Sequence, residues 1–294
     1  RRATNMADEI TFAGLEGKYT YDYRLLRESI VDALYPANNL LQFLNQKSLA
    51  GFASDSERFP KEPTLAAAAL TDGTDMANTA YSPSQVTLTV GEVGLMLTLT
   101  DLARTSSIAD ISFYGQGAGK AVLKKLTADI AALGSGFSTA QSTTGTNLTE
   151  AQFLAAKTSL IVSDVTEGYY SVLYPQQLED LIVDTGTTIN ALATTGSSAR
   201  MESNDLAMNQ SHDYGMFHGV HIVTNSQVPT ANAGADSAGF MAATGAALAY
   251  VEKWGVRVEQ ERDASLRGTE VVVTAAYAVG EIDDTRGVGI ITDR

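Results

Sequence analysis

The clearest pattern in the sequence is helical, because apolar residues return every three or four positions between Ser107 and Leu133. Ser107 and Asp110 have the spacing of a pair that caps a first turn, and Gly134-Ser135-Gly136 can end the last turn. At about 1.5 Å per residue the helix would be roughly 40 Å long, which predicts a scaffold element. Its apolar face comprises Ile111, Tyr114, Ala118, Val122, Leu126, Ile130 and Leu133.

Glycines interrupt the first half of this segment. Each one costs about 1 kcal/mol relative to alanine in a helix interior. We therefore expect a secure helix from Lys120 onward, with irregular or bent turns before it.

A second pattern, strict alternation, runs from Ser84 to Val90 and resumes through Leu95, Leu97 and Leu99. It predicts one long β-strand with a bulge or bend at Gly91 to Gly94. Between Ser54 and Tyr81, two prolines and the turn signal Asp72-Gly73 predict a two-stranded excursion with its tip near residues 68–80. Because a two-stranded ribbon is marginal alone in water, the excursion needs something to lie on, most simply another copy of the chain.

The N-terminal region is polar from Arg1 to Thr20, and Asp22 to Tyr35 then has the spacing of a short amphipathic helix ending before Pro36. An arm of this composition cannot bury much surface against its own chain. We expect it to be disordered or laid on a neighbour.

The second half begins with a Ser-, Thr- and Gly-rich linker over residues 135–147, where we expect a domain boundary. Thr149 and Gln152 form a capping-box pattern that opens a helix. Tyr169 to Tyr174 predicts a buried strand, and Pro175 starts a further helix over 176–183. The polar stretch 185–209 is expected to be a mobile loop.

The C-terminal part is rich in strands. A turn or short helix through Ala249 is expected among them, and we find no internal repeat. Helices and strands without a βαβα rhythm predict the α+β class. The predicted strands are 217–223, 238–243, 256–261, 269–279 and 288–291.

Composition narrows the functional classes. The chain of 294 residues is 44% hydrophobic and 18% charged, as folded soluble proteins are, and no apolar run is long enough to span a membrane. It contains no cysteine, which excludes disulfides and thiolate metal sites. The net charge of −14 argues against tight, sequence-independent binding of nucleic acid, although contact by confinement stays possible.

A glycine-rich stretch invites comparison with a phosphate-binding loop, in which backbone amides and a lysine cradle phosphates. That motif requires glycine where Tyr114 stands and Ser or Thr where Ala121 stands, so we expect no nucleotide site. The residues concerned are Gly115, Gly117, Gly119 and Lys120.

The three histidines, His212, His218 and His221, lie close together and could in principle bind zinc. On the predicted strand, however, the odd spacing of His218 and His221 sends their side chains to opposite faces. We therefore expect loop and strand histidines and no metal site.

The acids Glu281, Asp283 and Asp284 precede Arg286-Gly287 in a predicted hairpin loop, where adjacent acids are usually a solvated turn and no catalytic pair. No Gly-x-Ser-x-Gly elbow exists. Trp254 follows Tyr250 at helical spacing and is expected in the core. We thus expect no catalytic residue, no cofactor and no metal.

Taken in order, these elements resemble the major capsid proteins of tailed bacteriophages, which have the Hong Kong 97-type fold. The resemblance covers essentially the whole chain and rests on order and spacing, since no single motif is diagnostic. The segments that carry it are Val93 to Leu102, Asp129 to Leu133, Tyr174 to Leu178, Gly215 to Asn225 and Val228-Pro229.

The resemblance implies a division of the chain. Residues 1–44 would be an N-terminal arm with a short helix, and 45–100 an extended β-hairpin loop, the E-loop. Residues 101–145 would be a peripheral domain with a spine helix, and 146–240 an axial domain. Strands in 241–294 would return to complete both domains.

The resemblance also implies a function: hexamers and pentamers of an icosahedral shell enclosing double-stranded DNA, assembled in the host cytoplasm and located in the virion. Scaffolding and portal proteins, and possibly a decoration protein, would be partners, and no membrane would be involved. Two alternatives stay open. One is the shell of an encapsulin-like nanocompartment, and the other is a soluble hydrolase.

Overall fold

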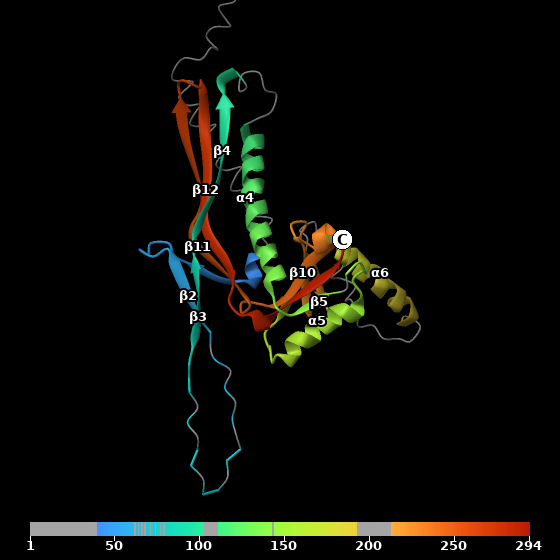
Figure 1. Cartoon of the computed structure of the whole chain (residues 1–294). Helices are drawn as coiled ribbons and strands as arrows, with labels where there is room; N and C mark the ends of the chain where they lie inside the picture. Colours follow the sequence, from blue (N-terminus) through green and yellow to red (C-terminus); the bar gives the residue numbers. More distant parts are fainter. Residues whose placement is uncertain are drawn as a thin grey trace, which may run out of the picture.

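The computed structural model describes residues 40–61, 80–102, 111–142, 144–192 and 213–294, together with part of the chain between 61 and 80. The predicted arm and short helix before residue 40 lie outside the described residues, as do Ser107, Asp110 and His212. The molecule is elongated, with a long sheet and a long helix on one side and a wider sheet with two helices on the other (Figure 1).

Four strands form the long sheet. Their order is β1 (Asn45–Ser48), β11 (Leu248–Asp263), β12 (Gly268–Glu281) and β4 (Gly91–Thr100). β1 runs parallel to β11, whereas β12 is antiparallel to both β11 and β4. The sheet therefore joins early strands of the chain to late ones.

The helix α4 (Ile111–Leu133) packs along this sheet against β12 and β4 (Figure 1). It is helical from Ile111, so the prediction of irregular turns before Lys120 is wrong. Gly117 is exposed, and no atom lies within 4 Å of the β-carbon that another residue would have there. Its only cost to the helix is the low helix propensity of glycine, and packing of the other residues of α4 outweighs that cost. A 3₁₀ turn, η3 (Gly134–Gly136), ends the helix as predicted. Its buried apolar residues include Ala118, Val122, Leu126 and Ile130.

The wide sheet forms the second unit. Its main order is β5 (Ala140–Ser142), β13 (Gly287–Asp293), β10 (Asp236–Ala243), β6 (Tyr169–Leu173), β8 (Val220–Thr224) and β7 (Asp213–Phe217). The short strand β9 (Thr230–Ala231) pairs with β10. Short 3₁₀ turns occur at η2 (Leu41–Phe43), η5 (Asn232–Gly234) and η6 (Asp284–Arg286).

Two helices accompany this sheet. The helix α5 (Glu150–Val162) begins at the predicted capping box, where Thr149 Oγ1 accepts from the Gln152 amide and Gln152 Oε1 accepts from the Thr149 amide. The helix α6 (Pro175–Leu192) begins at the predicted proline. Their side chains Phe153, Leu160, Leu178 and Leu181 share one buried cluster with residues of the wide sheet, including Met241, Leu173 and Ile222.

The opposite face of the wide sheet packs against α4 and the long sheet. Phe240, Tyr170 and Val172 share a second cluster with α4 and the long sheet. Phe43 of η2 stacks on Tyr170, with ring centroids 4.9 Å apart. The core therefore lies on both faces of the wide sheet, and the two units share it.

The excursion leaves the long sheet as a two-stranded ribbon. β2 (Ser56–Lys61) pairs antiparallel with β3 (Ser84–Thr89). The connecting residues 62–83 are called the tip segment below, and those of them that the structure describes extend away from the rest of the molecule (Figure 1). Asp72 and Gly73 form the predicted turn, with Gly73 at φ +77°.

Several predicted elements differ from the observed ones. The long strand expected over 84–99 is interrupted at Val90 and forms two strands in two sheets, β3 and β4. The expected linker contains β5, which pairs in parallel with β13. The expected mobile loop at 185–209 is helical as far as Leu192, as α6 continues. Residues 193–209 lie outside the described part.

Two further corrections concern the later strands. The expected strand 217–223 is a hairpin of β7 and β8 that turns at His218 and Gly219. Ala249 and Trp254 both lie in β11, so the predicted short helix and the helical spacing of Tyr250 and Trp254 are wrong. The α+β class and the strand-rich C-terminal part are confirmed.

Candidate assembly surfaces

The tip segment carries large apolar side chains that contact little of their own chain. Leu65, Leu70, Met76 and Tyr81 are 57%, 68%, 74% and 59% exposed. Such side chains at the end of a projecting ribbon indicate a surface that another molecule covers, because monomeric proteins rarely expose contiguous apolar area.

The tip segment is also acidic. Between residues 62 and 83 the sequence contains Glu62, Asp72 and Asp75 and no lysine or arginine. Asp72 and Asp75 are exposed. The tip segment is therefore both apolar and acidic.

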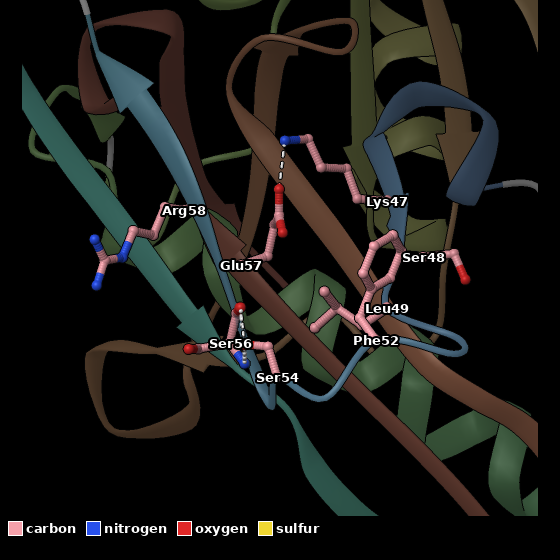
Figure 2. A pocket seen from close by; sticks show the side chains of 8 residues that line it. All are labelled: Lys47, Ser48, Leu49, Phe52, Ser54, Ser56, Glu57 and Arg58. Carbon is pink, nitrogen blue, oxygen red and sulfur yellow. Dashed lines mark hydrogen bonds and ion pairs between the residues drawn. The ribbon is translucent and has the colours of Figure 1, made fainter.

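An open groove of about 620 Å³ lies at the base of the excursion, between β1 and β2. Figure 2 shows Lys47 and Glu57 reaching toward each other across it, and their charged atoms are 2.6 Å apart. Leu49 and Phe52 lie to one side, and Arg58 projects from the far side of β2 (Figure 2). The lining residues are Lys47, Ser48, Leu49, Phe52, Ser54, Ser56, Glu57 and Arg58.

The turn that bears Phe52 is held by β11. The Lys253 ammonium donates to the carbonyl oxygens of Phe52 and Ser54 at 2.5 and 2.6 Å. The Leu49 amide donates to the Glu252 carbonyl at 2.7 Å, and the Leu49 side chain is buried. The Phe52 ring is nevertheless 66% exposed. Hydrogen bonds from β11 thus fix the backbone of the turn, while its aromatic ring is exposed.

A cluster of ion pairs ties the excursion to the C-terminal part of the chain. Lys61 Nζ on β2 lies 2.7 Å from Asp283 Oδ1, and Arg286 Nε lies 3.3 Å from Asp283 Oδ2. Arg286 also pairs with Glu167. Asp284 accepts from the backbone amide of Ser138 at 2.8 Å.

The acids of this cluster have opposite pKa shifts. Burial opposes ionisation of Asp283, but hydrogen bonds from Lys61 and Thr285 outweigh it and hold the pKa of Asp283 below its usual value. Burial, together with the negative charge of Asp284, raises the pKa of Glu281. Asp283 and Asp284 hold segments of the chain together, in the loop between β12 and β13 where they were predicted.

The remaining sequence candidates lie apart from one another. The three glycines considered for a phosphate loop are inside α4, where their backbone amides belong to the helix. His218 sits in the β7–β8 turn at φ +50°, with Nε2 2.9 Å from Glu150 Oε1. His221 lies on β8, against the ring of Phe43 at 4.9 Å.

Contrary to the prediction, His218 and His221 do not share a strand, because His218 lies in the turn before β8. Within the described residues, no group of three or more His, Cys, Asp or Glu side chains could hold a metal ion. Trp254 is partly buried, and the Arg257 guanidinium lies 4.6 Å from its ring centroid.

Reasoning from the sequence missed the groove. Its lining comes from β1, β2 and the turn between them, and Lys253, which holds that turn, is 201 positions away from Phe52. The only local signal is Phe52 itself, an aromatic residue in the small and polar stretch Gly51 to Ser56.

No protein-family model matches the sequence, and no curated protein is significantly similar to it. Solved structures, in contrast, match over most of the chain. The capsid structure of cyanophage P-SCSP1u is 16% identical, with a TM-score of 0.61, over 86% of this chain and 87% of that one. The capsid asymmetric unit of cyanophage Pam1 is 14% identical, with a TM-score of 0.65, over 91% and 92% of the two chains.

A virus-like particle from Pyrococcus furiosus also matches, at 12% identity and a TM-score of 0.58, over 91% of this chain and 98% of that one. No helix among the described residues is both long and apolar enough to cross a bilayer. These likenesses extend over most of each chain and show a shared fold. The chain has the Hong Kong 97-type fold found in the capsid proteins of tailed phages.

Proposed function

We propose that this protein is a structural shell subunit, the major capsid protein of a tailed-phage head. The observation that carries the proposal is the tip segment, whose exposed apolar side chains require a partner. Because the fold matches that of capsid proteins over most of the chain, another copy of the same chain is the partner with the strongest support.

The proposal extends to the assembly. Subunits form hexamers and pentamers of an icosahedral shell that encloses double-stranded DNA without reading its sequence. The net charge of −14 suits the inner wall of such a shell, because negative charges on the protein repel the phosphates of packaged DNA and keep the DNA from adhering. Scaffolding and portal proteins, and a decoration protein where one exists, are the proposed partners. The proposed location is the virion, after assembly in the host cytoplasm.

The proposed domains follow the observed units. The long sheet with α4 corresponds to the peripheral domain, the wide sheet with α5 and α6 to the axial domain, and the excursion to the E-loop. Strands β11 and β12 complete the first unit and β13 completes the second. No enzymatic activity is proposed. A broad screen with ester and phosphate substrates tests this point and the hydrolase alternative together.

Electron microscopy of the purified protein tests the function. We expect closed, uniform shells, over a range of salt and protein concentrations and with co-expressed scaffolding protein where it is required. Monodisperse monomers under all these conditions would contradict the proposal.

A nanocompartment shell is the second candidate, favoured by the likeness to the Pyrococcus furiosus virus-like particle over nearly all of that chain. The content of native particles separates the two. Nuclease-protected double-stranded DNA supports the phage head, whereas a co-purifying enzyme inside nucleic-acid-free particles supports the compartment.

A further inference from the structure

The solvent face of α4 concentrates positive charge in an acidic chain. Lys120, Lys124 and Lys125 are exposed on this face, and they are three of the eight lysines in the sequence. Asp129 is the single acid of α4, and it is paired with Lys125. With three lysines against one acid, the helix has a net charge of +2 in a chain whose net charge is −14.

Two of these lysines are unpaired within the described part of the chain. Lys120 and Lys124 make no hydrogen bond or ion pair there. An exposed ammonium group on a rigid helix is therefore available to a negative partner outside the subunit. The remaining described lysines are held by partners in the same subunit, namely Lys47, Lys61, Lys125, Lys157 and Lys253.

This face of α4 has no hydrophobic anchor. From Gly117 onward, its exposed residues other than lysine are Gly117, Ala121 and Ala132. None of the large exposed apolar side chains among the described residues lies on the helix. Protein partners are held mainly by aromatic or apolar anchors, whereas nucleic acid is held by cations at its phosphates. The chemistry of this face therefore fits a phosphate backbone better than a protein segment.

We propose that Lys120 and Lys124 contact phosphates of the DNA that the shell encloses, so that α4 faces the interior. The inference rests on the proposed shell function and adds which face of the subunit meets the DNA. The two lysines are four positions apart, which is about 6 Å along a helix. One DNA strand has a phosphate about every 3.4 Å of its axis, so the two ammonium groups can reach different phosphates.

The other side of the long sheet has the opposite charge. Val271 and Val273 of β12 share a buried cluster with α4, so Glu270 between them in the alternation lies on the far side of the sheet. Glu261 of β11 is directly opposite Glu270 in the strand register, and Glu259 is exposed on the same side. These carboxylates repel phosphates. The charges of the two sides therefore favour one orientation of the subunit toward enclosed DNA.

The contact depends on enclosure. Two lysines in each subunit cannot hold free DNA tightly in a chain with a net charge of −14. Contacts of this kind are independent of sequence and weaken as salt concentration rises. Inside a closed shell the DNA cannot diffuse away, so its effective concentration at the wall is high. The lysines therefore act on packaged DNA without binding it in solution.

Lysine footprinting of intact particles tests the proposal. DNA-filled particles and particles emptied of DNA are treated briefly with a small amine-reactive reagent that passes through the shell, and mass spectrometry gives the modified fraction of each lysine. We expect Lys120 and Lys124 to be protected in filled particles and to lose this protection in emptied ones. Lys157 is the internal control, because the carbonyl of His218 holds its ammonium group in both kinds of particle.

Each other outcome of the footprinting counts against the inference. Equal reactivity of Lys120 and Lys124 in filled and emptied particles overturns it and leaves the shell function standing. Protection in DNA-free particles that contain a scaffolding protein would assign these lysines to that protein. Particles that never contain DNA would contradict the phage-head function itself, and the inference with it.

Removal of the two charges supplies a second readout. A Lys120→Gln, Lys124→Gln double variant should still assemble, because both side chains are exposed and unpaired within the described residues. Its particles should release DNA at a lower temperature than wild type, because the phosphate contacts are lost. The matched control is Lys120→Arg with Lys124→Arg, which keeps the charge and should keep the wild-type release temperature. Equal release temperatures for wild type and the Gln variant, or a loss shared by the Arg variant, would overturn the proposal.

Discussion

Gly134 lies against the ring of Phe240 so closely that a β-carbon on Gly134 would be 2.1 Å from Phe240 Cδ1. This contact seats the end of α4 on β10, the central strand of the wide sheet. The two units therefore meet at a residue that can have no side chain.

Gly134→Ala is predicted to destabilise the subunit. Filling a packed site costs about 1–3 kcal/mol, which exceeds the helix-propensity gain of alanine. Urea unfolding measures the change. Gly117→Ala is the matched control, because nothing lies within 4 Å of its would-be β-carbon, and it should stabilise the protein by about 0.5–1 kcal/mol. Equal effects of the two variants would contradict the contact.

Val122→Asp is predicted to unfold the subunit. Val122 is 5% exposed in the core shared by α4 and the long sheet, and an unpaired buried carboxylate costs several kcal/mol. Circular dichroism and solubility provide the measurement. Ala121→Asp, one position away on the exposed side of α4, should remain folded. A soluble, assembly-competent Val122→Asp protein would show that this face is not buried.

Deletion of residues 66–79 is predicted to leave a folded subunit that does not assemble. Every described residue in this range is exposed, so the removed residues contribute little to the core. Thermal unfolding should change little, while sedimentation and microscopy should show no shells. Normal shells from the deletion variant would refute the role given to the tip segment.

Asp283→Asn is predicted to destabilise the protein at neutral pH. The folded-state pKa of Asp283 lies below its ordinary value of 3.8, so its ionised form stabilises the fold. This contribution is present above pH 3.8 and is lost as the pH falls through the folded-state pKa. The difference in urea midpoint between wild type and variant should therefore shrink as the pH falls below 3.8.

Glu281→Gln is the opposite case in the same cluster. The folded-state pKa of Glu281 is raised above its ordinary value of 4.5, so ionised Glu281 weakens the fold at neutral pH. The variant should be more stable than wild type at pH 7, and the difference should vanish below pH 4.5. A destabilised Glu281→Gln protein at neutral pH would mean that the carboxylate has a favourable partner.

Local chemistry made part of the fold predictable. The capping box at Thr149 and the proline at Pro175 set where α5 and α6 begin, and both signals act within one helical turn. The apolar face of α4 was predictable because burial follows its period. Alternation likewise revealed β3 and β4 as strands, though it could not show that they belong to different sheets.

The missed features depend on rarer local conformations or on distant residues. The β7–β8 turn has positive φ at both His218 and Gly219, as a tight hairpin turn requires, and a histidine gives little warning of this. The acidity of the tip segment could be read from the sequence. The groove could not, because the turn that bears Phe52 is held by Lys253, which lies on a strand much later in the chain.

The ion pair of Lys61 with Asp283 has a consequence for the order of events during synthesis. The two residues are 222 positions apart, and β4 likewise pairs with β12 near the end of the chain. While a ribosome is still making the last strands, the excursion has no fixed base and α4 has no complete sheet to rest on. A nascent chain therefore cannot present a correctly oriented excursion to its neighbours. In the proposed shell, a subunit could therefore join its neighbours only after its polypeptide is complete.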